Sequence, residues 1–391
     1  MRDLSLLDKI LLTSKNQDID SIPSLISIVI LGMVNIAILY VAPVLIGAMV
    51  EVLNFSEAQA GYVISGELLG MLLATFPALY YVGRINWRKA VFWALIFMIV
   101  GGLISASVES FQPLLISRFL FGLAAGFSMA ICLSAIGLTS NPDRTFGFWV
   151  TGQLVMGALG LFILPTLFPT WGFGFVYILT IPLILLLMFM LRFLPNQRPK
   201  KPKNEESNHQ PLMVWSIAGL LSIFVYYIGQ YGVWAYIDRI GSAIGLTPEN
   251  IGESLGLATI IGIGGSLGAA ILSTKFGRLL PIAFGVTISI VSMGILLNDF
   301  NAIQFLVAAC MFNFMFNFIL PYLMACVAAI DITGKLIILT SVSSSAGLSV
   351  GPALAAVVQQ SMSFDMVIII GIILTAFSFL LAARLAIYKA H

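Results

Sequence analysis

Long apolar stretches separated by short polar turns run through the whole chain. A membrane-spanning helix needs about 20 mostly apolar residues, and twelve stretches of this kind can be counted. We expect helices over 23–49, 57–81, 89–107, 112–138, 145–166, 171–194, 212–237, 248–273, 279–297, 301–327, 334–357 and 363–387. The pattern therefore predicts an all-α membrane protein with about twelve transmembrane helices.

Two of the predicted helices have a clear start signal. Ser56 and Gln59 have the spacing of a capping box, in which each side chain bonds the other residue's backbone N–H. Thr247 followed by Pro248 suits an N-cap and the first helical position. These signals place the starts of the second and eighth helices.

The polar segment NQRPKKPKNEESNHQP divides the pattern into two sets of six helices. The stretches that begin at Ser56 and at Thr247 resemble each other, because each has a capped start, a Gly-rich helix and a loop with Gly and Arg. Internal repeats with a substrate site between them are typical of secondary transporters. We therefore predict two pseudo-symmetric six-helix bundles, at 23–195 and 212–387, joined by a linker at 196–211. An N-terminal tail at 1–22 and a C-terminal tail at 388–391 complete the chain.

Composition supports a membrane protein and narrows the function. The chain is 60% hydrophobic and 9% charged, whereas soluble domains average about 25% charged residues. A net charge of +2 gives no strong field for nucleic acid. The three cysteines lack metal-ligand spacing, and the two histidines, His209 and His391, lie in the linker and at the last position. We expect no metal, no cofactor and no enzyme activity, and the missing Walker motif argues against ATP-driven transport.

The positions of lysine and arginine predict the orientation. If the N-terminus is cytoplasmic, 17 of the 19 basic residues fall in the tails and inside loops, only Arg239 falls outside, and Arg118 lies within a helix. This asymmetry predicts a multi-pass protein of the inner membrane with both termini in the cytoplasm. We expect a monomer in the lipid bilayer.

These features together resemble the major facilitator superfamily. The loop Gly83-Arg84-Ile85-Asn86-Trp87-Arg88-Lys89 is similar to the family's inside-loop signature, with Gly83 and Asn86 replacing its Asp and second Gly. The corresponding loop of the other half contains Lys275, Gly277 and Arg278 and also lacks the Asp. The fourth helix carries an Arg-x-x-x-Gly run, Arg118 to Gly122, which the family associates with proton coupling. The fifth helix, with Gly152, Gly157, Gly160 and Pro165, is similar to a motif of family exporters.

The resemblance implies a secondary transporter that moves a small organic molecule by alternating access, coupled to protons, with export slightly favoured. An uncoupled facilitator or a flippase for lipids and amphiphiles is the alternative. In hydrocarbon, ionisable side chains are costly and point to function. Glu67 lies near the middle of the second helix and Arg118 within the fourth. Burial favours a neutral carboxyl, so Glu67 could carry a proton, and Arg118 could pair with Glu67 or bind an anion.

Polar and aromatic side chains within other helices are candidates for the substrate cavity. Tyr226 and Gln230 share one face of the seventh helix, and Asn313 and Asn317 share one face of the tenth. Each could equally serve helix packing. The full set of cavity candidates is Asn35, Tyr40, Gln153, Tyr226, Tyr227, Gln230, Tyr231, Asn313 and Asn317. Candidates for a cytoplasmic gate are Arg84, Arg88, Lys89, Asp143, Arg144, Lys275 and Arg278.

Overall fold

The computed structural model describes residues 18–136, 138–140, 142–195, 213–272, 275–297, 300–330 and 335–388. Most of the predicted N-terminal tail, the linker 196–211 and the last three residues lie outside these ranges. The helices are α2 (Ile22–Asn35), α3 (Ala37–Glu51), α4 (Glu57–Tyr81), α5 (Trp87–Ser107), α6 (Phe111–Ile136), α7 (Pro142–Trp171), α8 (Phe175–Met190), the 3-10 turn η1 (Leu191–Phe193), α9 (Met213–Ala243), α10 (Pro248–Leu272), α11 (Leu279–Ile295), α12 (Ala302–Ile330), α13 (Lys335–Ser361) and α14 (Phe364–Tyr388).

The all-α membrane fold is confirmed. Within the described residues, eleven helical spans are long and apolar enough to cross a membrane, and α11, with 17 residues, is a shorter apolar helix. The expected capping box is present, with backbone N–H groups of Ser56 and Gln59 donating to each other's side chains at 3.0 and 3.2 Å. Thr247 caps α10 by accepting from the N–H of Asn250.

The first predicted helix is not continuous. It divides at Ile36, whose φ of −117° and ψ of 9° leave the α-helical region, and α3 starts at the next residue. The ring of Pro43 disturbs a helix only as far back as the fourth preceding residue, so Pro43 does not cause this break. The hydrophobic pattern continues through Ile36, which is why the sequence predicted one helix.

Two helices continue at least five residues beyond their predicted ends. α7 continues beyond 166 to Trp171, with Pro165 and Pro169 inside it. α9 continues beyond 237 to Ala243, so Arg239 lies in a helix rather than in a loop. Prolines near the end of α7 and the charged residues Asp238 and Arg239 near the end of α9 suggested loops, whereas helical turns continue through them.

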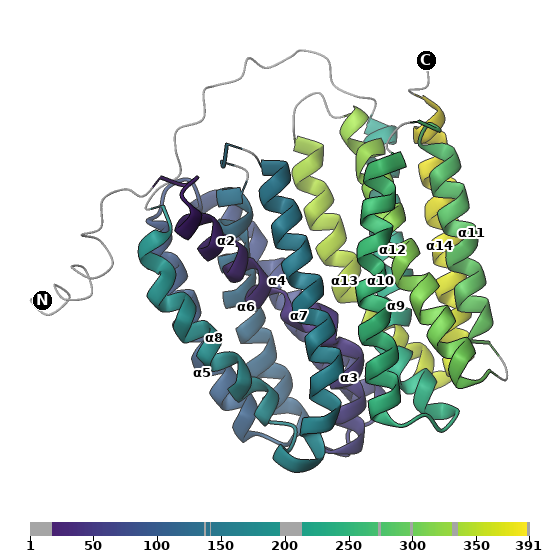
Figure 1. The fold of residues 1–391 in the computed structure, drawn as a ribbon, viewed down its shortest axis with the longest axis horizontal. Coiled ribbons are helices and arrows are strands. Elements are labelled where there is room, and N and C mark those ends of the chain that lie inside the picture. Colours follow the sequence, from purple (N-terminus) through teal and green to yellow (C-terminus); the bar gives the residue numbers. More distant parts are fainter. Residues whose placement is uncertain are drawn as a thin grey trace, which may run out of the picture. The chain divides into compact units, whose positions relative to one another are not determined.

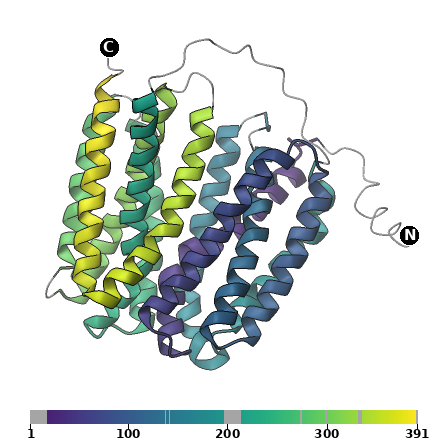
Figure 2. The same ribbon diagram turned by 180° about the vertical axis from the view of Figure 1, so that it is seen from behind.

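The described residues form two compact units, which divide α3, α4 and α7 between them. The first unit comprises Met1–Tyr40, Gly66–Met156 and Trp171–Lys203. Its core lies among α2, α5, α6 and α8, where Trp87, Leu95 and Cys132 are fully buried. α5 runs beside both α6 and α8 in the two views of the ribbon (Figures 1 and 2).

The second unit comprises Val41–Ser65, Gly157–Thr170 and Asn204–His391. α9 is its central helix and packs against α10, α12, α13 and α14, while α11 packs on α12 and α14 (Figure 1). Small residues allow α9 and α13 to approach closely, since a Cβ on Gly232 would lie 3.1 Å from the carbonyl oxygen of Gly351.

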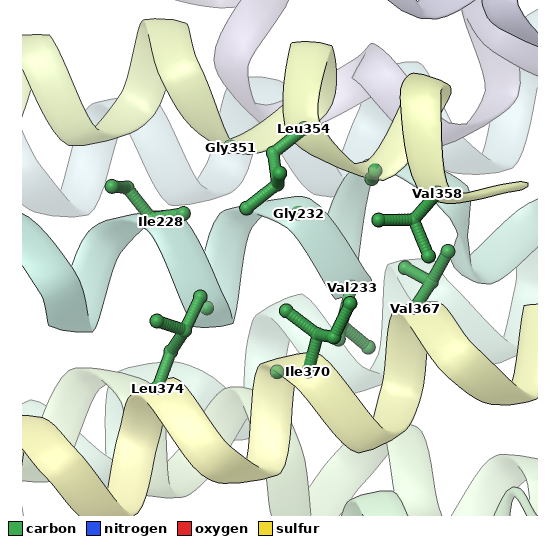
Figure 3. Close-up of a pocket in the computed structure, with 12 residues that line it drawn as sticks. Ile228, Gly232, Val233, Gly351, Leu354, Val358, Val367, Ile370 and Leu374 are labelled. Carbon is green, nitrogen blue, oxygen red and sulfur yellow. The ribbon is translucent and has the colours of Figure 1, made fainter.

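A narrow apolar gap runs along α9 where it meets α13 and α14. Figure 3 shows Val233, Leu354, Val358 and Ile370 pointing into it from these three helices. The gap offers about 10 Å³ of room for water, close to the minimum volume that holds a single water molecule. It is therefore a packing seam and cannot hold an organic solute.

Candidate functional site

The two ionisable residues predicted within helices of the first unit form a buried ion pair. Nη2 of Arg118 on α6 lies 2.6 Å from Oε2 of Glu67 on α4, and Nε of Arg118 donates to the same oxygen at 2.8 Å. The two side chains are 1% and 3% exposed, for Glu67 and Arg118 respectively. Each charge therefore has its partner in a setting where an unpaired charge would be strongly destabilising.

Glycines bring α4 and α6 close enough to hold this pair. A Cβ on Gly122 would lie 2.0 Å from the carbonyl oxygen of Glu67, and one on Gly126 would lie 2.4 Å from that of Met71. On the facing helix, a Cβ on Gly70 would lie 2.3 Å from the carbonyl oxygen of Phe119. The backbones touch at these three positions, so the Arg-x-x-x-Gly run positions Glu67 through its glycine as well as its arginine.

Two aromatic rings also hold the guanidinium of Arg118. Its Cζ lies 4.0 Å from the ring centre of Phe121 and 4.5 Å from that of Tyr177. Such cation–π contacts contribute about 2 kcal/mol when desolvated. If Glu67 took up a proton, Arg118 would stay charged, because a guanidinium does not deprotonate in proteins, and the rings would still stabilise it. The arrangement can therefore carry one exchangeable proton without losing its positive charge.

A second polar group of the first unit lies around the break between α2 and α3. Nδ2 of Asn35 donates to Oγ of Ser128 on α6 at 3.1 Å, and the hydroxyl of Tyr40 donates to Oε1 of Gln153 on α7 at 3.1 Å. Oδ1 of Asn35 and Nε2 of Gln153 are buried and have no hydrogen-bond partner among the described residues. The structure thus brings three cavity candidates, Asn35, Tyr40 and Gln153, to one stretch of the first unit.

The aromatic face predicted on α9 packs against α12. Tyr226 stacks on Phe316 with ring centres 5.8 Å apart and donates to its carbonyl oxygen, while Tyr227 meets the same ring edge-on. Tyr226, Tyr227 and Tyr231 are all buried. The rings of Tyr226 and Tyr227 thus pack between α9 and α12.

The amide nitrogen of Gln230 joins three helices of the second unit, whereas its Oε1 is buried and has no hydrogen-bond partner among the described residues. Its side chain is 0% exposed, and its amide donates to Ser289 on α11 and Thr375 on α14, at 3.0 and 2.9 Å. Asn317 donates to the carbonyl and side-chain oxygens of Asn313, one turn earlier on α12. This asparagine pair faces Gly262 on α10. The amide of Gln230 thus forms hydrogen bonds between helices, and that of Asn317 forms them within α12.

The candidates for a cytoplasmic gate have different surroundings. Arg88 is fully buried and its Nε donates to the carbonyl oxygen of Leu194, which ties the start of α5 to the end of η1. Arg84 is exposed and its guanidinium lies over the ring of Tyr80. Of the remaining candidates, Lys89 and Lys275 are exposed and Arg278 is half-buried. The side chains of Asp143 and Arg144 lie outside the described part of the structure.

The sequence interpretation missed an ionic cluster in the second unit. Arg239 on α9 pairs with Glu51 at the end of α3 and with Glu57 at the start of α4, at 2.8 and 2.9 Å. Asp238 beside it is buried, and its carboxyl lies against Gly47, where a Cβ would be 2.0 Å from Oδ1. The signal available in the sequence was an acidic residue on each side of the first predicted outside loop, Glu51 and Glu57, together with the single basic residue predicted outside, Arg239.

The same part of the second unit contains two close helix crossings. A Cβ on Gly252 of α10 would lie 2.5 Å from the carbonyl oxygen of Leu161 on α7. Likewise, a Cβ on Gly61 of α4 would lie 2.1 Å from the hydroxyl of Tyr236 and 3.2 Å from the side chain of Ala356 on α13. Gly61 and Gly252, which lie in the two stretches that resemble each other in sequence, thus both lie at helix contacts.

Comparisons with known proteins agree with this architecture. A family model described as Major Facilitator Superfamily matches residues 26–331. An uncharacterized MFS-type transporter of Bacillus subtilis, YceJ, is 26% identical over 327 residues, which cover 79% of this chain and 82% of that protein. A D-xylose-proton symporter-like protein of Arabidopsis thaliana is 26% identical over 147 residues, 36% of this chain and 29% of its own. A second, chloroplastic protein of that name is 32% identical over 76 residues, 19% of this chain and 14% of its own.

Proposed function

The chain belongs to the major facilitator superfamily, whose members are transporters, and on that basis we propose that it couples the movement of a small organic solute to protons. The buried pair of Glu67 and Arg118 is the observation that carries this proposal. Buried ionisable residues within membrane helices commonly belong to proton relays or substrate pathways. The symporter-like names of two relatives give additional support for protons as the coupling ion.

The proton would move on and off the carboxyl of Glu67. Protonation removes the negative charge that faces Arg118, so the free energy that holds α4 to α6 at this point falls while the glycine contacts remain. Release of the proton to the other side of the membrane restores the pair. The conformational change between the two states would then follow the charge state of one residue.

The ionic cluster around Arg239 would act as a gate. The distribution of basic residues favours an inner-membrane protein with both termini on the cytoplasmic side. In that orientation the end of α3, the start of α4 and the end of α9 face the opposite side of the membrane. The ion pairs of Arg239 join α9 to α3 and α4. The close crossings at Gly61 and Gly252 likewise bring helices from the first half of the sequence into contact with helices from the second half. Separation of these contacts would open that side, as alternating access requires.

Purified protein in liposomes with a trapped pH-sensitive dye tests the coupling. A panel of sugars, amino acids, amines and carboxylic acids is added outside, and we expect at least one solute to move protons with it. Glu67→Gln should abolish the solute-dependent proton flux, whereas Arg384→Gln, at an exposed cation on α14, should retain it. If labelled solute crosses at the wild-type rate in Glu67→Gln and an uncoupler has no effect, the protein is a facilitator and the coupling proposal is wrong.

The direction of transport follows from the same assay. The Gly-rich α7, with Pro165 and Pro169, favours export, as in the family exporters that it resembles. The symporter-like relatives favour uptake. Proton and solute fluxes in the same direction indicate uptake along the natural gradient, and opposite fluxes indicate export. We propose that a single chain is the transporting unit, because it contains both sets of six helical segments.

A further inference from the structure

The break between α2 and α3 falls in the middle of a membrane span. Ile36 has 14 residues of the Ile22–Glu51 span before it and 15 after it, or about 21 and 22 Å of helix. Irregular backbone at this depth is tolerated where protein buries it or where it lines a polar cavity. In transporters, broken helices at the midplane commonly form the substrate site.

Two unpartnered amide groups lie beside this break. Asn35, the last residue of α2, is 1% exposed, and Gln153, which Tyr40 holds on the other side of the break, is 3% exposed. Oδ1 of Asn35 and Nε2 of Gln153 have no hydrogen-bond partner among the described residues. A buried polar group without a partner is destabilising, and native proteins rarely leave one. Two of them beside one helix break indicate a place where something else completes their hydrogen bonds.

We propose that this place is the part of the transport site that binds a neutral, hydroxyl-bearing solute, such as a sugar or polyol. The inference rests on the proposed transport function and names its substrate class. A hydroxyl both donates and accepts, so it can pair with the oxygen of one amide and the nitrogen of the other. Both amides are uncharged, which suits a neutral ligand.

The charges of the first unit also favour a neutral ligand. Glu67 and Arg118 neutralise each other, and Arg88 is bonded to the carbonyl oxygen of Leu194. No other charged side chain is buried among the described residues of this unit. While Glu67 is ionised, this pair therefore offers no free counter-charge to a cationic or anionic solute, and burying an unpaired charge is far more costly than burying a hydroxyl.

Trp149 provides a spectroscopic reporter for the site. Its indole lies against Gly32, one helical turn before Asn35, where a Cβ would be 2.1 Å from Nε1. Purified protein in detergent is titrated with D-glucose, myo-inositol, D-glucosamine and D-gluconate while tryptophan fluorescence is recorded. We expect a saturable change with the two neutral compounds and binding at least about tenfold weaker with the charged ones. Trp149→Phe should remove most of the change.

Substitutions then assign the binding to the two amides. Asn35→Leu and Gln153→Leu should each weaken binding about tenfold or more, because each removes a hydrogen bond to the ligand. Ser105→Ala removes another buried hydrogen-bonding side chain, on α5 of the same unit, and should leave the affinity unchanged. If either leucine variant does not fold, Tyr40→Phe, which frees the amide of Gln153, should weaken binding by a smaller factor.

The outcomes separate this inference from the proposed function. If neither neutral compound binds, or if both leucine variants bind as the wild type does, the assigned substrate class is wrong even when Glu67-dependent proton flux with another solute is present. If the neutral compounds bind through Asn35 and Gln153 but no proton flux accompanies them, the site is correct and the coupling proposal fails.

Discussion

Replacement of either member of the Glu67–Arg118 pair should have unequal effects on stability. Glu67→Gln leaves Arg118 charged, buried and without a counter-charge, because arginine does not deprotonate. Arg118→Met leaves Glu67, which can take up a proton and become neutral. The glutamate substitution should therefore be the more destabilising of the two, although it is the smaller change in shape.

The structure sets the size of the difference. Removal of one partner of a buried pair costs about 3–5 kcal/mol. The rings of Phe121 and Tyr177, at 4.0 and 4.5 Å, still stabilise the guanidinium by up to about 2 kcal/mol, so Glu67→Gln should cost about 2–4 kcal/mol. Arg118→Met loses the cation–π contacts but can neutralise the remaining carboxyl, so we expect about 1–2 kcal/mol.

Unfolding in mixed detergent micelles, monitored by circular dichroism, measures both values and that of the double variant. Glu67→Gln with Arg118→Met contains no buried charge at this position, and it should be more stable than Glu67→Gln alone. Strong non-additivity is thus expected for this contacting pair. If the two single changes cost the same, or if their effects add in the double variant, the pair is not the buried, mutually dependent contact described above.

The glycine contacts and the ionic cluster give further expected outcomes. Gly122→Ala should lower the unfolding free energy by about 2 kcal/mol or more, because its Cβ would overlap the carbonyl oxygen of Glu67. Gly294→Ala in α11 serves as the control: no atom lies within 4 Å of the added Cβ, so the change should be neutral or stabilising by up to about 1 kcal/mol. Gly252→Val should separate α10 from α7, and a cysteine placed nearby in α7 should then react faster with a membrane-impermeant maleimide; an unchanged rate would contradict the closed crossing. Arg239→Gln should lower the unfolding free energy by about 1–3 kcal/mol, because Arg239 and Glu57 are only 15% and 18% exposed and Glu57 would lose its partner, and it should increase the same labelling rate; a folded protein with unaltered labelling would show that the cluster is no gate.

The family resemblance and the positions of most helices could be read from the sequence. Apolar length and the short separators determined the twelve helical segments, because lipid requires each span to satisfy its own backbone hydrogen bonds. Side chains that are costly in hydrocarbon stand out within such segments, and for that reason the sequence alone indicates Glu67 and Arg118. Capping at Ser56 and Thr247 was equally readable, because its partners lie within three residues.

Only the tertiary structure decided which polar side chains have partners. Gln230 and Gln153 look alike in the sequence, but Gln230 has two acceptors on α11 and α14, whereas the amide nitrogen of Gln153 has none among the described residues. The break at Ile36 was also hidden, because no Pro or Gly marks it. Helical periodicity tells which face a residue occupies, whereas hydrogen bonds and charge pairs depend on which distant helix lies opposite that face. Composition and local pattern thus specified a membrane transporter, and helix packing selected the residues through which it could bind and couple.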